Sequence, residues 1–87
     1  MAEPEAPDRP VKRSLTLSGH RTSVSLEAAF WDAFRELAAG RGVSVNALAA
    51  EIDAARMPPA SLASAIRVFV LREIRAGSPR RGPDPRA

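Results

Sequence analysis

The sequence has 87 residues, no cysteine and a formal net charge of +3. This length allows one small domain, and the lack of cysteine excludes disulfides and thiolate metal sites. No apolar run approaches the ~20 residues of a membrane helix, and the first residues carry acids where a secretory signal would be basic. We therefore expect a cytoplasmic protein without membrane contact.

Both ends of the chain are rich in proline, glycine and charge. Such segments bury too little apolar surface to offset the entropy that is lost on ordering. We expect residues 1–10 to form a disordered tail, residues 11–76 a folded domain, and residues 77–87 a disordered basic tail. An ordered part of roughly 65 residues is marginal for burial, which favours a homodimer.

Positive charge is distributed unevenly along the chain. Four basic residues and no acid lie between residues 9 and 21, and six arginines against two acids lie from residue 67 onward. Acids outnumber bases by five to three between residues 27 and 56. This distribution suits a polyanion bound against one face of the domain.

Two segments alternate between polar and apolar residues, as half-buried strands do. Residues 21–26 put Thr22, Val24 and Leu26 on one face, and residues 11–18 alternate in the same way. A lone strand leaves its backbone groups without hydrogen-bond partners. Strand 21–26 is therefore expected to pair, most simply with its counterpart in a second copy.

A hairpin within one chain is also possible. Gly19 can adopt the positive φ that a tight turn at Ser18-Gly19 requires. If Leu17 then lies opposite His20, every apolar residue of both strands falls on one face. The sequence leaves open whether residues 12–18 pair within the chain.

Three segments with helical periodicity follow the strands. In residues 27–39, Phe30, Phe34, Leu37 and Ala38 form an apolar stripe that Trp31 flanks, while the acids, Glu27 among them, lie toward solvent. Glycines at positions 40 and 42 predict its end.

The second helix is expected to begin with Ser44 as its N-cap and to end at Arg56, before the pair Pro58-Pro59. A third begins at Ser61 and ends before Gly77. The fold class is thus mainly α with a short β ribbon, in the order strand, strand, helix, helix, helix.

A strand at 21–26, a helix, the turn Gly42-Val43-Ser44 and a second helix resemble the ribbon-helix-helix family of bacterial DNA-binding proteins. The chain is most similar to an extended variety of that family with an added strand and a third helix. The residues that carry this likeness, over positions 12 to about 75, are Lys12-Arg13-Ser14, Gly19–Ser23 and Glu51–Arg56.

The resemblance implies an obligate homodimer, possibly a tetramer, that binds double-stranded DNA and regulates transcription. In that family the paired strands enter the major groove as an antiparallel ribbon, and outward side chains read base edges. The implied base-contacting residues are Arg21, Ser23 and Ser25. An arginine can bind guanine through two hydrogen bonds, whereas a serine distinguishes bases poorly.

The family also uses the start of the second helix to bind a DNA phosphate. The corresponding residues are Ser44, Val45 and Asn46, and Lys12 and Arg13 would add salt-dependent contacts to the DNA backbone. The implied dimer core consists of Val24, Leu26, Phe30, Phe34, Leu48 and Ile52.

Catalysis is not expected. The chain has one histidine, His20, and no nucleophile elbow, glycine-rich phosphate loop or metal-spaced cluster. We expect no enzyme activity, no metal site and no cofactor.

An alternative function is a dimer of the same fold that does not bind DNA and acts as a protein-interaction or assembly module, with the third helix as a possible partner surface. A closed hairpin would give the dimer a four-stranded sheet with about 14 Å between its outer strands. The major groove is about 12 Å wide, so such a sheet would not lie flat in it. Whether residues 12–18 pair within the chain and cover the edge of the ribbon thus separates the two hypotheses.

Overall fold

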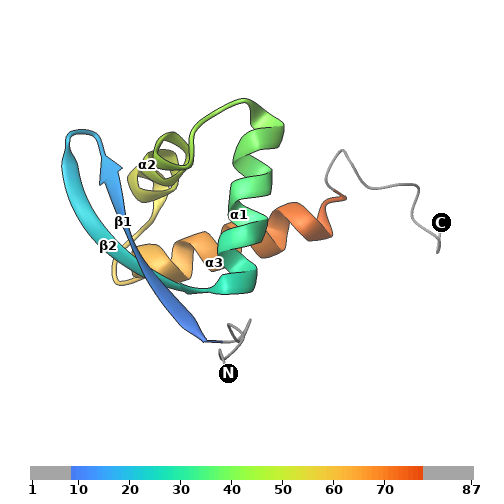
Figure 1. The fold of residues 1–87 in the computed structure, drawn as a ribbon, viewed down its shortest axis with the longest axis horizontal. Coiled ribbons are helices and arrows are strands. Elements are labelled where there is room, and N and C mark those ends of the chain that lie inside the picture. The colour runs from blue at the N-terminus through green and yellow to red at the C-terminus, as the bar shows by residue number, and fades with distance from the viewer. Residues whose placement is uncertain (1–8, 78–87) are drawn as a thin grey trace, which may run out of the picture.

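The computed structural model describes residues 9–77, which form a two-stranded antiparallel sheet followed by three helices (Figure 1). The elements are β1 (Pro10–Leu17), β2 (His20–Glu27), α1 (Ala28–Arg41), α2 (Val45–Ala55) and α3 (Leu62–Arg75). The predicted fold class and element order are confirmed. Most of the two predicted tails, residues 1–8 and 78–87, lies outside the described residues, and β1 begins one residue before the expected domain start.

The two strands pair with each other in one chain. Leu17 lies opposite His20 and Leu15 opposite Thr22, which is the register that the hairpin alternative predicted. The turn between them has positive φ at both residues, 49° at Ser18 and 94° at Gly19. This is the pattern of a type I′ turn, whose twist matches that of the strands it joins. The question that the sequence left open is thus answered in favour of the closed hairpin.

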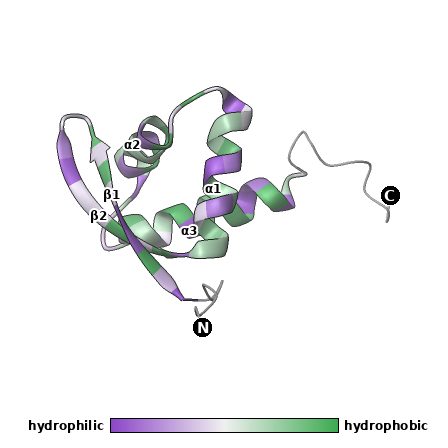
Figure 2. Ribbon diagram, viewed as in Figure 1, coloured by the Kyte–Doolittle hydropathy of each residue, from purple (hydrophilic) through white to green (hydrophobic). Residues whose placement is uncertain are grey.

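The helices cover one face of the hairpin. Leu15, Leu17, Val24 and Leu26 point toward them and are at most 5% exposed. Figure 2 shows hydrophobic and hydrophilic stretches succeeding one another along both strands. Because side chains alternate along a strand, six polar residues of β1 and β2 are held on the opposite face, whereas Arg13, His20 and Thr22 share the side of the buried residues.

Serine hydroxyls cap the second and third helices. Ser44 Oγ accepts a hydrogen bond from Ala47 N at 3.0 Å, and Ser61 Oγ accepts one from Ser64 N at 3.1 Å. Both caps satisfy backbone N–H groups that have no acceptor inside the helix. The first helix ends at Arg41, with Gly42 as its C-cap at a φ of 71°, and it runs two residues further than predicted.

Trp31 belongs to the centre of the core, where the stripe pattern had placed it at the flank. It is 2% exposed, and its Nε1 donates a hydrogen bond to the carbonyl of Val11 at 2.8 Å. Its ring lies 6.4 Å from that of Phe34, which meets Phe69 edge to face at 6.3 Å. Aromatic contacts thus connect β1, α1 and α3, while Phe30 is only half-buried.

Two sets of side-chain contacts hold α3 against the rest of the domain. Arg67 donates to both carboxylate oxygens of Glu27, at 2.9 and 3.3 Å, and its guanidinium lies 5.9 Å from the Phe30 ring. Arg41 is 3.0 Å from the carboxylate of Glu73. Glu27 was expected to face solvent as a residue of the first helix. It is instead the N-cap of α1 and is half-buried beside Arg67.

The residues expected between two copies lie largely inside one chain. Four of the six, Val24, Leu26, Phe34 and Leu48, are at most 4% exposed in the single chain, and Phe30 and Ile52 are half-buried. The closed hairpin and α3, whose Ile66 and Val70 are also buried, complete this core. Dimerisation and the predicted dimer core both remain predictions, and of the six residues only Phe30 and Ile52 keep a substantial exposed surface in the single chain.

We predict that Trp31→Phe lowers the free energy of unfolding by about 1 to 3 kcal/mol, because phenylalanine keeps part of the packing but loses the hydrogen bond to Val11 and leaves a void. Urea denaturation followed by circular dichroism measures the change. A midpoint equal to that of the wild type would show that the indole does not hold β1 against α1.

The contact between Glu27 and Arg67 predicts a dependence of stability on pH. Hydrogen bonding and the positive charge of Arg67, together with a backbone N–H, hold the pKa of Glu27 below its ordinary value. A carboxyl group whose pKa is lowered by folding stabilises the protein above its unfolded-state pKa, about 4.3 for glutamate, and loses that contribution as the pH falls through the folded-state value.

Glu27→Gln should therefore be less stable than the wild type at neutral pH, and the difference should shrink below about pH 4.3. Urea midpoints measured from neutral to acidic pH test this. Glu51→Gln is the matched control, because Glu51 is exposed and has no ion pair within residues 9–77. A difference that stays constant with pH would contradict the assignment.

Candidate nucleic-acid interface

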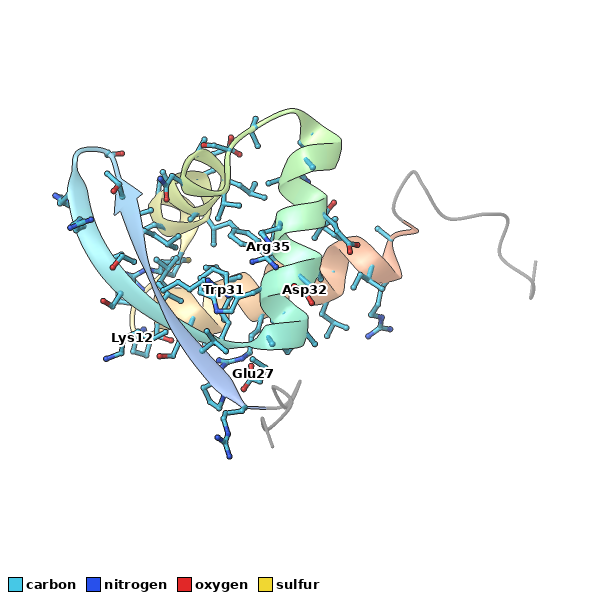
Figure 3. The ribbon with its side chains drawn as sticks, viewed as in Figure 1. Lys12, Glu27, Trp31, Asp32 and Arg35 are labelled. Atoms are coloured by element: carbon cyan, nitrogen blue, oxygen red, sulfur yellow. The ribbon has the colours of Figure 1, made fainter. Side chains whose placement is uncertain are left out.

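The face of the hairpin that points away from the helices carries basic and hydroxyl side chains. The register pairs Lys12 with Ser25, Ser14 with Ser23 and Thr16 with Arg21. We call these six residues the outer face. All are exposed except Ser25, which is half-buried, and none of the six is acidic. The next pair of the register on this side is Pro10 with Glu27, whose carboxylate is bound to Arg67. Figure 3 shows Lys12 extending away from the helices.

The two edges of the hairpin differ. The backbone N–H of Thr16 donates to Asn46 Oδ1 at 3.1 Å, so it points away from β2 and toward the start of α2. Near the turn, β1 lies between β2 and α2 (Figure 1). In an antiparallel pair, the N–H and C=O groups of successive residues point alternately toward and away from the partner strand. Because Arg21 lies opposite Thr16, its N–H and C=O point away from β1. Ser23 and Ser25 do the same, which leaves β2 with an open hydrogen-bonding edge.

A hollow of about 290 Å³ lies where the start of α2 meets β1. We call it the α2 hollow; its lining residues are Arg13, Ser14, Leu15, Trp31, Arg35, Ser44, Val45 and Asn46. The Ser44 hydroxyl is bound to Ala47 N, but the first N–H groups of the helix, at Val45 and Asn46, have no intrahelical acceptor. The positive end of the helix dipole and two guanidinium groups make the hollow suitable for an anion.

The sequence placed Lys12 and Arg13 together as phosphate contacts, and the structure puts them on different surfaces. Lys12 is on the outer face, whereas Arg13 is opposite Val24 and its guanidinium carbon lies 5.8 Å from the centre of the Trp31 ring. This cation–π contact positions Arg13 at the α2 hollow. The hollow therefore joins four of the five predicted phosphate-contacting residues: Arg13, Ser44, Val45 and Asn46.

Arg35 was not predicted as a site residue. It lies on α1 one turn after Trp31, close to it in Figure 3, and pairs with Asp32 on the protein surface. The signal was present in the sequence, because residues four apart share a helix face. It could not be interpreted there, since only the fold shows that this face borders β1 and the start of α2.

The structure also bears on the other candidate chemistries. His20 is exposed and opposite Leu17, next to the turn. No group of three histidine, aspartate or glutamate side chains within residues 9–77 could hold a metal ion. The helices described here are too short or too polar to cross a membrane.

Comparison with known proteins agrees with this architecture. A family model described as a ribbon-helix-helix domain matches residues 10–74, which span both strands and nearly all of the three helices. Among solved structures the chain is similar to an uncharacterized protein from Bordetella pertussis Tohama I, with 30% sequence identity, a TM-score of 0.69, and coverage of 97% of this chain and 70% of that chain. No curated protein matches the sequence. With both strands and the helices inside the match, the chain belongs to the ribbon-helix-helix domain family.

Proposed function

We propose that the protein is a homodimeric DNA-binding protein that regulates transcription. The observation that carries this proposal is the outer face, where Lys12 and Arg21 stand among four hydroxyl side chains and the one acid that follows on this side, Glu27, is paired with Arg67. Basic groups attract the phosphate backbone, and hydroxyl groups donate hydrogen bonds to it. Membership of the family supports the same conclusion, since ribbon-helix-helix proteins are typically DNA-binding regulators.

The dimer forms when β2 pairs with β2 of a second copy. The open edge of β2 supports this, because unpaired backbone groups on a strand edge are a template for another strand. The strand order becomes β1, β2, partner β2, partner β1, and the two outer faces join into one surface. Two copies thereby double the positive charge that faces the DNA.

The closed hairpin changes how this sheet meets DNA. With four strands, about 14 Å separates the outer strands, which exceeds the major-groove width of about 12 Å. The sheet therefore straddles the groove, and each β1 lies over a wall of phosphates where Lys12 makes contact. This revises the two-stranded insertion that the resemblance implied.

Straddling also divides the roles of the three predicted base-contacting residues. Arg21 is on the central strand and is long enough to reach into a groove about 8.5 Å deep, whereas Ser23 and Ser25 are too short to reach base edges from its rim. Arg21 is thus the residue of the three that recognises base edges. Most of the affinity comes from phosphate contacts and is weakly dependent on sequence.

The α2 hollow supplies a second phosphate contact beyond each outer strand. Its position beside β1 supports this role, because the groove walls continue past the edge of the sheet. The guanidinium groups of Arg13 and Arg35 and the N–H groups of Val45 and Asn46 would surround the phosphate oxygens. Anions bind well at such helix starts.

The alternative is that the same dimer assembles with other proteins and does not bind DNA. The width of the four-stranded sheet is the observation that favours it, since nothing then has to enter a groove. Titration with random duplex DNA at several salt concentrations separates the two functions. No binding at about 50 mM salt, where phosphate contacts are strong, would favour the alternative.

We predict that Lys12→Ala weakens binding to random duplex DNA and reduces the slope of log affinity against log salt by about 0.9 for each phosphate that is no longer neutralised. Fluorescence anisotropy of labelled duplex measures both quantities. Arg75→Ala is the matched control, because it removes one exposed charge from α3 and should leave the slope unchanged. Equal effects of the two substitutions would show that the outer face has no special role.

We predict that Ser23→Pro gives a folded monomer. Proline removes the N–H that β2 offers to a second copy, but this N–H points away from β1, so the hairpin can still form. Sedimentation equilibrium measures the mass, and circular dichroism shows whether the helices remain. Ser23→Thr keeps the N–H and should stay dimeric. A dimeric Ser23→Pro protein would show that the copies associate through another surface.

A further inference from the structure

A groove of about 520 Å³ runs between α2 and α3 on a surface that the proposed DNA interface does not use. Its lining is mostly apolar and includes Ile52, Ala55, Met57, Ala65, Val68 and Phe69. Met57 is 75% exposed and Val68 49% exposed, which is unusual for large apolar side chains that border a hollow. Alanines on both helices, Ala55 and Ala65, create the hollow, because a larger side chain at either position would fill it.

The charged residues of the groove are both arginines. Arg56 lines the α2 side, where its guanidinium binds the Asp53 carboxylate at 2.7 Å and the Ala60 carbonyl at 2.8 Å. Arg72 lines the α3 side and has no ion pair or side-chain hydrogen bond within residues 9–77. No acid is among the lining residues. The groove therefore combines an apolar floor with an unneutralised positive charge at its edge.

These charges distinguish between two possible occupants. A second copy docked through the same groove would bring the unneutralised Arg72 of both chains to one interface, and like charges at an interface are costly. An acidic partner would gain from the same charges. The shape favours a helix, because the walls of the groove are themselves two helices and an amphipathic helix presents a stripe of apolar side chains to such a groove.

We propose that the groove between α2 and α3 binds an acidic amphipathic helix of another protein. Large apolar side chains of that helix occupy the space above Ala55 and Ala65, between Met57 and Val68. Its acids pair with Arg72 and supplement Asp53 at Arg56. The outer face lies on the hairpin, whereas the groove lies between two helices. The protein can therefore bind DNA and this partner independently.

A designed peptide tests the proposal. It carries leucine at positions i, i+3, i+4 and i+7 of a helix with glutamate beside them, and a matched peptide carries lysine in place of glutamate. Fluorescence anisotropy of each labelled peptide with the full chain measures affinity. We expect the glutamate peptide to bind and the lysine peptide to bind at least about tenfold more weakly.

Three variants locate the binding surface. Arg72→Glu should weaken binding of the glutamate peptide by about tenfold and strengthen binding of the lysine peptide. Val68→Ser should weaken binding of the glutamate peptide, because it removes apolar surface from the groove. Arg21→Glu makes the same charge change on the outer face and should leave peptide affinity unchanged while reducing DNA binding. Arg72→Glu should leave DNA binding unchanged, so failure of the groove and failure of the DNA interface can be told apart.

Several results would overturn the proposal. They are equal binding of the two peptides, equal loss of peptide binding in Arg72→Glu and Arg21→Glu, and no binding of the glutamate peptide at all. Self-association that persists in Ser23→Pro and disappears in Val68→Ser would show that a second copy occupies the groove. Circular dichroism of each variant confirms that the substitution leaves the fold intact.

Discussion

The two-residue turn at Ser18 and Gly19 sets the register on which the rest of the domain depends. With Leu17 opposite His20, the apolar residues of both strands share the face that the helices cover. A slip of one residue would exchange the two faces of a strand. The same register assembles the outer face, so one turn fixes both the core of the chain and its basic surface.

The third helix and the hairpin together explain why a domain this small can bury a core within one chain. Ile66 and Val70 of α3 belong to the same buried cluster as the apolar residues of the hairpin, and Arg67 connects α3 to Glu27 at the end of β2. A ribbon-helix-helix unit without these additions would leave more of its apolar surface for a partner copy. In the proposed dimer, the second copy would not be needed to complete the core, and the two copies would pair through the backbone of β2.

Much of the fold could be predicted from local patterns. Alternation predicted both strands, and serine caps with the proline pair predicted the limits of α2 within a residue. The Ser18-Gly19 turn gave the correct register for the hairpin, which the sequence left as one of two alternatives. These features depend on residues that are close in sequence. The end of α1 was placed too early because the first of the two glycines, Gly40, continues the helix, which stops only before the positive φ of Gly42.

The sites were less predictable, because they combine residues that are far apart in the chain. Arg67 and Glu27 are separated by 40 positions, and Asn46 is 30 positions from the strand residue that it binds. Trp31 and Phe30 are neighbours on a helix, and only the direction of β1 decides which of them is buried. Arg35 and the groove between α2 and α3 could not be anticipated for the same reason.

The hydrogen bond from Thr16 to Asn46 has a consequence for the size of the assembly. It occupies part of the free edge of β1, while the matching edge of β2 stays open. A sheet with two open edges can add chains without end and grow into a fibre. In the proposed dimer, the two outer edges of the sheet belong to β1, and their obstruction would stop further strands from adding to the pair.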